Sequence, residues 1–116
     1  MKRRLDKYLY DIYRAIEEIE SFLSSRPKKF DTFCKDLIFR RAVERNLEII
    51  GEAMNRALKI NPNIPITSAR KIVNTRNYVI HAYDSLSEEI LWGIVMKDLP
   101  VLKIEIKDLL DKKHSE

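Results

Sequence analysis

Apolar residues recur at helical spacing along almost the whole chain. In the first segment, from Leu5 to Ser25, they return every third or fourth position, at Leu5, Tyr8, Ile12, Ile16, Ile19 and Leu23. This spacing places them on one face of a helix. The predicted helix ends before Pro27, because proline disfavours the helical conformation of the residue that precedes it.

A second predicted helix begins at Asp31 or Thr32, either of which can cap it, and runs to Leu58. Its apolar stripe consists of Phe33, Leu37, Val43, Leu47, Ile50, Met54 and Leu58, and its polar stripe of Arg41, Arg45, Glu48, Glu52 and Asn55. Gly51 lies in the middle of this helix, where glycine costs about 1 kcal/mol relative to alanine. Either a close approach of another helix or a tolerated defect would account for it.

The remaining pattern predicts three further helices, over residues 69–83, 87–99 and 100–112. Thr67 or Ser68 can cap the first of them, and Ser85-Leu86-Ser87-Glu88 has the spacing of a capping box before the next. Pro100 either kinks the chain or opens the last helix as its first residue. Residues 114–116 are expected to fray.

These elements predict an all-α, up-and-down bundle of four to five helices. The chain has 116 residues with only two glycines and four prolines, a composition that favours long helices over sandwiches, barrels and glycine-rich nucleotide loops. Its length suits a single domain over residues 1–116.

The single cysteine, Cys34, excludes an internal disulfide and a zinc site built on paired cysteines. The longest apolar run, Ile90 to Met96, covers seven residues and is far too short to span a bilayer. We expect no secretory signal, no membrane association, no metal and no cofactor. A free thiol fits a reducing compartment, so a cytoplasmic location is predicted.

Positive charge is concentrated in the middle of the chain. Residues 26–83 carry twelve basic and five acidic side chains, a net charge of +7, whereas the whole chain carries +4. A polyanion would be attracted to this region. Chance drift of a mixed-charge helical surface is an equally acceptable explanation of the charge alone.

The segment from Arg76 to Tyr83 carries the candidate chemistry. On one continuous helix the near neighbours of Arg76 would be Ile72, Val73, Val79 and Ile80, all of them apolar. An arginine in such a setting is either paired or faces a cleft. Asn77 and His81 are four residues apart and therefore adjacent, and Tyr83 lies about 20° from Arg76 around the helix. A purely structural alternative pairs Arg76 with Glu48 or Glu52 and leaves His81 as an interface histidine.

The pattern Arg76-Asn77-x-x-x-His81-x-Tyr83 resembles the Arg-x4-His-x-Tyr motif of HEPN proteins, and more narrowly of the HepT toxins of HEPN–nucleotidyltransferase toxin–antitoxin pairs. The similarity covers nearly the whole chain, including the stretches 45–53, 64–72, 90–92 and 97–100. Ile66 departs from the pattern, since many relatives carry a tryptophan after the proline, and we expect this difference to affect packing only.

The resemblance implies a metal-independent endoribonuclease toxin with Arg76 and His81 as catalytic residues and a 2′,3′-cyclic phosphate as product. Histidine moves a proton near neutral pH, and arginine matches the oxygens of a phosphate. Asn77 and Tyr83 are expected to support them, Asn77 by orienting the imidazole or contacting phosphate. Glu52 and Arg45 are expected to act from a second layer.

Family members are homodimers whose motif helices line a basic cleft, and the resemblance implies the same here. It also implies that Tyr83 accepts AMP from a partner nucleotidyltransferase of the MNT type, which would place negative charge beside Arg76 and silence the toxin. A packing role for Tyr83 is the alternative. Tyr8, Tyr10, Tyr13 and Trp92 are interpreted as core or interface residues rather than surfaces for stacking bases.

Two other functions stay open. The chain could be a non-catalytic helical module that docks a minimal nucleotidyltransferase and serves as its substrate. It could also be a general nucleic-acid binder that relies on the basic region, with affinity that falls steeply with salt and without cleavage.

Overall fold

The computed structural model describes residues 2–80 and 85–114, and every regular element in them is helical. The elements are α1 (Lys2–Ser24), α2 (Phe30–Lys35), α3 (Leu37–Ile60), α4 (Ala69–Val73), α5 (Thr75–Ile80), α6 (Ser85–Gly93), the π-helix η1 (Ile94–Asp98) and α7 (Leu99–His114). The predicted all-α helical bundle is therefore confirmed.

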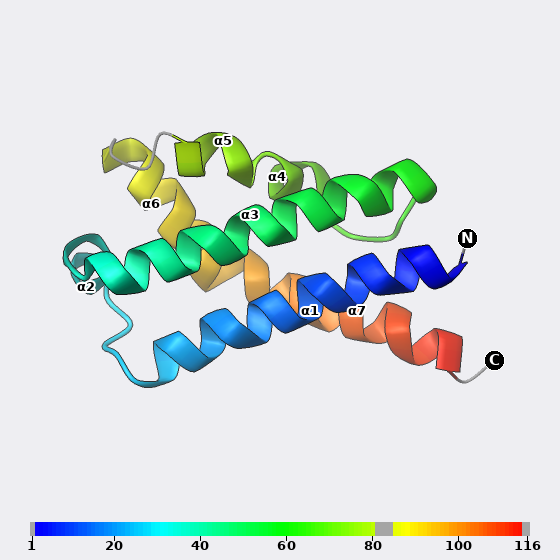
Figure 1. Ribbon diagram of the computed structural model, residues 1–116, viewed down its shortest axis with the longest axis horizontal. Helices are drawn as coiled ribbons and strands as arrows, with labels where there is room; N and C mark the ends of the chain where they lie inside the picture. Colours follow the sequence, from blue (N-terminus) through cyan, green and yellow to red (C-terminus); the bar gives the residue numbers. More distant parts are fainter. Residues whose placement is uncertain (1, 81–84, 115–116) are drawn as a thin grey trace.

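Two long helices, α1 and α3, lie side by side along the length of the molecule (Figure 1). The third long helix, α7, packs along α1, while α4 and α5 lie on α3. The short helices α2 and α6 cover one end of the bundle (Figure 1). This arrangement places α5, which carries Arg76, against α3.

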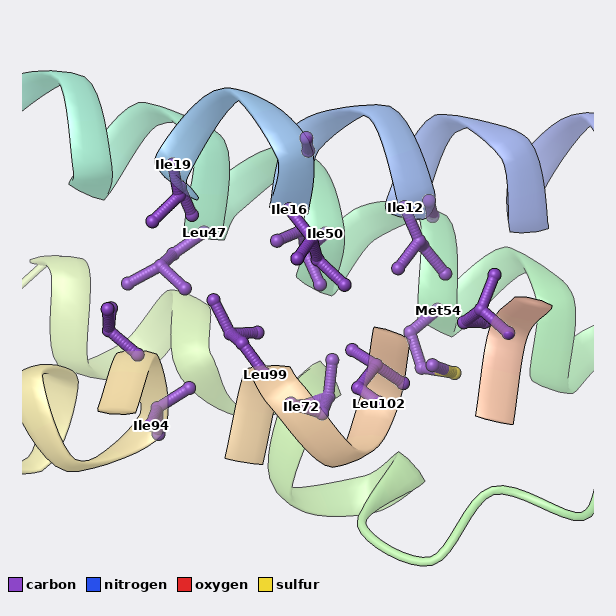
Figure 2. Close-up of a cluster of buried hydrophobic side chains, with 14 of the residues drawn as sticks. Ile12, Ile16, Ile19, Leu47, Ile50, Met54, Ile72, Ile94, Leu99 and Leu102 are labelled. Carbon is purple, nitrogen blue, oxygen red and sulfur yellow. The ribbon is translucent and has the colours of Figure 1, made fainter. Parts of the chain in front are cut away.

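One hydrophobic core joins these helices, and Figure 2 shows its centre. Two predicted stripes contribute to it, with Ile12, Ile16 and Ile19 from α1 and Leu47, Ile50 and Met54 from α3. The later elements complete it with Ile72, Ile94, Leu99 and Leu102. Ile66, the position that departs from the family pattern, is also buried. No helix in the described ranges is both long and apolar enough to cross a membrane.

The predicted helix over residues 31–58 is in fact two helices that meet at Asp36. The backbone N–H of Asp36 donates to Thr32 at 2.9 Å and ends α2, while its carboxylate accepts from the N–H of Phe39 at 3.1 Å and caps α3. Aspartate side chains compete for backbone donors in this way, which favours helix ends over helix interiors. As a result Leu37, expected in the apolar stripe, is 53% exposed at the start of α3.

The single helix predicted over residues 69–83 is also wrong. It breaks at Asn74, whose N–H donates back to Arg70, and the following helix, α5, begins at Thr75. Ser68 occupies the N-cap position of α4 but makes no capping hydrogen bond. The hydroxyl of Thr67 instead donates to Glu105 of α7 at 2.7 Å.

The chain from Ser85 to His114 is nearly continuous helix, with a π-helical stretch at Ile94–Asp98. The predicted kink or new helix start lies two residues later, at Pro100. The N–H of Leu99 donates to the carbonyl of Ile94, five residues back. Pro100, which has no N–H to donate, follows as the second residue of α7 rather than the first.

Candidate functional site

Arg76 and Asn77 project from α5 as exposed side chains. The preceding residue, Thr75, is fully buried, and its hydroxyl lies 2.8 Å from the carbonyl oxygen of Ile72 and 3.3 Å from that of Leu47 on α3. Thr75 thus ties the start of α5 to the middle of α3. The continuous helix on which Arg76 was expected to have four apolar neighbours is broken at Asn74, and Arg76 is exposed on α5.

His81 and Tyr83 lie outside the described residues. Their placement relative to Arg76 and Asn77 therefore stays a prediction from the motif. Among the predicted site residues, Arg76, Asn77, Arg45 and Glu52 have described side chains.

Arg76, Arg45 and Glu52 line one cavity of about 450 Å³. Its walls come from α1, α3 and α5, and the remaining lining residues are Lys7, Tyr8, Asp11, Glu48, Ile49, Ala53 and Arg56. The structure thus brings Arg76 to the same cavity as Arg45 and Glu52, two predicted site residues that precede it by more than twenty positions in the sequence. Asn77 is not among the lining residues.

The two carboxylates considered as partners of Arg76 pair with other cations. Glu52 accepts from Nε of Arg56 at 2.9 Å, and Glu48 lies 3.8 Å from the guanidinium of Arg45. Among the ion pairs between described residues, none involves Arg76. Its guanidinium is exposed beside the cavity, where it can meet an anionic ligand.

Residues of α1 complete the cavity, and sequence reasoning missed them. Tyr8 lies in the wall with Arg56 near its ring, at 5.9 Å from the ring centroid. A hydrogen bond with Arg56 lowers the pKa of Tyr8, and the hydrogen bond with Glu52 raises the pKa of Arg56. The signal for Arg56 was present, since it continues the polar stripe of Arg45, Glu48 and Glu52 by one more turn. Nothing in the local sequence places α1 against that stripe.

The cavity suits a phosphate-bearing ligand better than a metal ion. Arginine side chains supply planar, permanently charged donors that match phosphate oxygens. In the part of the chain that the structure describes, no three His, Cys, Asp or Glu side chains converge as metal ligands would.

Comparison with known proteins identifies the family. The model of the family described as "Ribonuclease HepT-like" matches residues 12–109. The chain belongs to the HepT-like ribonuclease family. The predicted resemblance to HepT proteins is thereby confirmed.

Curated relatives agree with this assignment over nearly their whole length. A protein of Thermococcus cleftensis named "Probable ribonuclease HepT" is 40% identical over 113 residues, which cover 94% of this chain and 98% of the relative. A protein of Methanocaldococcus jannaschii named "Putative RNase MJ1380" is 34% identical, covering 91% of this chain and 96% of the relative. No solved structure gives a significant match.

Proposed function

We propose that this HepT-like chain is a metal-independent endoribonuclease toxin that cleaves RNA through Arg76 and His81. The observation that carries the proposal is the exposed guanidinium of Arg76, which forms no ion pair with another described residue and lines a cavity together with Arg45 and Glu52. Membership of a ribonuclease family supplies the reaction class.

The reaction divides between the two side chains. The imidazole of His81 takes the proton of a ribose 2′-hydroxyl, whose oxygen attacks the adjacent phosphorus and displaces the 5′-oxygen of the next nucleotide. The guanidinium of Arg76 stabilises the negative charge that develops on the phosphate oxygens. The departing 5′-oxygen takes up a proton from water, and the imidazolium returns its proton to the solvent. The products are a 2′,3′-cyclic phosphate and a 5′-hydroxyl end.

Neighbouring residues support this pair. Asn77, four residues before His81, orients the imidazole or contacts the phosphate. Tyr83, two residues after His81 in the motif, is the second supporting residue. Arg45 and Glu52 share the cavity with Arg76 and set the charge around it. Glu52 acts mainly through Arg56, with which it pairs at 2.9 Å.

The proposal includes a cytoplasmic homodimer and a regulatory partner. Two copies would place both motif segments at one cleft, as the family resemblance implies. A nucleotidyltransferase antitoxin of the MNT type would transfer AMP to Tyr83. The added phosphate would lie near Arg76 and compete with RNA for it.

Incubation of total RNA with the purified protein in excess EDTA tests the enzymatic proposal. Wild type should cleave, whereas His81→Ala and Arg76→Ala should be inactive. Arg70→Ala is the matched control for Arg76, because Arg70 is an exposed arginine on the neighbouring helix α4, outside the cavity. Cleavage retained by His81→Ala would contradict the assigned mechanism.

The regulatory part needs its own experiment. Intact-mass measurement of the protein after incubation with the cognate transferase and ATP should show an added adenylyl group on wild type and none on Tyr83→Phe. Modification of Tyr83→Phe would show that another residue is the acceptor. A protein that is modified but never cleaves RNA would favour the non-catalytic docking module.

A further inference from the structure

The cavity that Arg76 lines does not end at that residue. A second cavity of about 300 Å³ is lined by Arg4, Tyr8, Glu52, Arg56, Lys59 and Ile60. Tyr8, Glu52 and Arg56 line both cavities, so the two form one depression, here called the α1–α3 groove. It follows the two long helices that lie side by side in Figure 1.

The groove is long enough for several nucleotides. Arg45 lies near Arg76 at one end, and Lys59 lies at the other. Both belong to α3, and fourteen positions separate them, which corresponds to about 21 Å at the rise of an α-helix. A single phosphate or mononucleotide would occupy only part of this length.

Positive charge increases along the groove away from Arg76. The cavity beside Arg76 is lined by four basic and three acidic residues, so its charges nearly balance. One residue of each sign, Lys7 and Asp11, comes from α1. The second cavity has Arg4, Arg56 and Lys59 against Glu52 alone. Glu52 is already paired with Arg56, so Arg4 and Lys59 remain as exposed cations at the far end. A polyanion is therefore attracted along the groove as well as at its catalytic end.

Tyr8 stands at the junction of the two cavities. Its ring is half-buried against the core, and Lys7 Nζ and the Arg56 guanidinium lie 5.7 and 5.9 Å from the ring centroid. An aromatic ring among basic side chains in a groove is the arrangement with which proteins bind unpaired bases, by stacking on the ring and by contacts to the backbone. Tyr8 thus packs against the core, as predicted, and also lines the groove.

We propose that the α1–α3 groove binds single-stranded RNA, with Arg4 and Lys59 on its phosphates and Tyr8 against a base. The proposal rests on the ribonuclease function and extends it, because the groove holds the strand that continues from the phosphate at Arg76. It also assigns the substrate class, since a base inside a duplex is stacked on its neighbours and cannot reach Tyr8.

Binding of a fluorescein-labelled 2′-O-methyl RNA strand to the full chain tests the proposal without cleavage, because the probe has no free 2′-hydroxyl. Fluorescence anisotropy is measured over a range of salt concentrations. Arg4→Ala/Lys59→Ala should weaken binding and reduce the slope of log K against log salt by about 1.4, at about 0.7 for each lost phosphate contact. Tyr8→Leu should weaken binding about five-fold or more, as for loss of one stacked base.

Lys97→Ala/Lys107→Ala is the matched control, because it removes the same charge from exposed positions on η1 and α7 outside the groove. It should bind the probe as wild type does. Tyr8→Leu should leave affinity for the same strand in a duplex unchanged. Because Tyr8 also packs against the core, the thermal unfolding of the Tyr8→Leu protein is measured in parallel. The Arg4→Ala/Lys59→Ala protein tests the groove independently, since both of its substitutions are at exposed positions.

The outcomes separate the groove from the catalytic proposal. If Arg4→Ala/Lys59→Ala has the affinity and salt slope of wild type, the proposal that the α1–α3 groove binds RNA is wrong, even if wild type cleaves RNA. An equal loss in the Lys97/Lys107 control would also overturn it, because net charge alone would then account for binding. If the groove substitutions weaken binding but the wild-type protein never cleaves RNA, the RNA-binding role of the groove is supported and the proposed ribonuclease activity is contradicted.

Discussion

Gly51 on α3 lies directly against Thr75 at the start of α5. A Cβ atom at position 51 would be 2.9 Å from the Thr75 hydroxyl oxygen and 3.2 Å from the carbonyl oxygen of Ile72. Of the two explanations that the sequence left open for this glycine, close approach of another element is therefore correct. The contact fixes the residue that precedes Arg76, so it connects the packing of α3 with the candidate site.

Gly51→Ala should destabilise the protein by up to about 2 kcal/mol. The added methyl group gains about 1 kcal/mol of helix propensity, but it crowds a buried hydroxyl and a backbone carbonyl, and overpacking of this kind costs about 1–3 kcal/mol. Chemical denaturation measures the change in the free energy of unfolding. RNA cleavage should fall as well, because α5 must shift and Arg76 moves with it.

Gly93→Ala is the control for this prediction. Gly93 has helical dihedral angles, and a Cβ there would have no neighbour within 4 Å among the residues that the structure describes. The substitution should stabilise the protein by about 0.5–1 kcal/mol and leave cleavage unchanged. If Gly51→Ala is as stable as Gly93→Ala, α3 and α5 are not packed as tightly as described.

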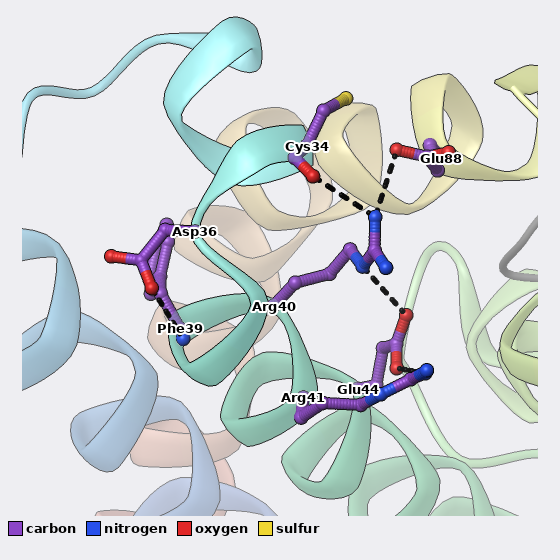
Figure 3. Close-up of polar contacts among 7 residues, drawn as sticks. All are labelled: Cys34, Asp36, Phe39, Arg40, Arg41, Glu44 and Glu88. Carbon is purple, nitrogen blue, oxygen red and sulfur yellow. Dashed lines mark hydrogen bonds and ion pairs between the residues drawn. The ribbon is translucent and has the colours of Figure 1, made fainter.

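Arg40→Leu should destabilise the protein by about 3 kcal/mol. Arg40 lies in the half-buried cluster of Figure 3, 3.4 Å from Glu88 of α6, 3.8 Å from Glu44, and 3.0 Å from the carbonyl oxygen of Cys34. Removing its charge leaves two largely buried carboxylates without this cation, which is the costly way to break such a cluster. Urea denaturation measures the loss.

Arg41→Leu provides the comparison. Arg41 also pairs with Glu44, at 2.9 Å, but its side chain is 64% exposed, against 16% for that of Arg40. Solvent screens the exposed guanidinium of Arg41, and Glu44 keeps Arg40 as a neighbouring cation at 3.8 Å, so this variant should lose about 1 kcal/mol or less. If Arg40→Leu and Arg41→Leu lose the same free energy of unfolding, burial of the arginine does not determine how much it stabilises the protein.

Cys34 should react slowly with thiol reagents. Burial, with Glu88 contributing, raises the pKa of its thiol from 9.0 to about 11. At about pH 8 the thiolate population is then about a hundredfold smaller than for an unperturbed cysteine, and the thiolate is the reactive form. The rate with Ellman's reagent in the native protein, compared with the rate in denaturant, measures the difference.

The same pKa shift predicts a loss of stability in alkali. Between about pH 9 and 11 the folded chain keeps the Cys34 proton while the unfolded chain releases it, so the free energy of unfolding falls as pH rises through this window. Cys34→Ala should reduce that dependence. Equal dependence in wild type and Cys34→Ala would show that other groups cause the loss.

Asp36→Ala should lower the melting temperature by roughly 4 °C, the effect expected for loss of a helix N-cap in a domain of this size. The Phe39 N–H and the Arg26 guanidinium hold the pKa of Asp36 below its ordinary value. Its stabilising contribution is therefore complete above that ordinary value of 3.8 and is lost as pH falls below it. Thermal unfolding from about pH 3 to 7 measures both effects.

Asp31→Ala is the matched control for Asp36. Asp31 pairs with Lys35 at 3.2 Å, but its side chain is 73% exposed and caps no helix. It should change the melting temperature little. A similar loss in both variants would indicate that negative charge near α2, rather than the cap, is responsible.

The sequence alone determined the helical class, the main apolar stripes and the family. These depend on local periodicity and on motif residues within one segment, which a single chain displays directly. The buried positions Ile12, Ile16, Leu47, Ile50 and Met54 were all in the predicted stripes. The motif pointed to Arg76 before any neighbouring element was known.

Only the tertiary structure decided which residues surround Arg76. The helix break at Asp36 depends on one side chain that competes for a backbone N–H, which hydrophobic periodicity does not reveal. The break at Asn74 leaves no mark in that periodicity either. The packing of α1 against α3 brings Lys7 and Tyr8 beside Arg56, many positions away in the chain. Contacts between helices follow from how their faces fit together, so the groove could not be read from any one of them.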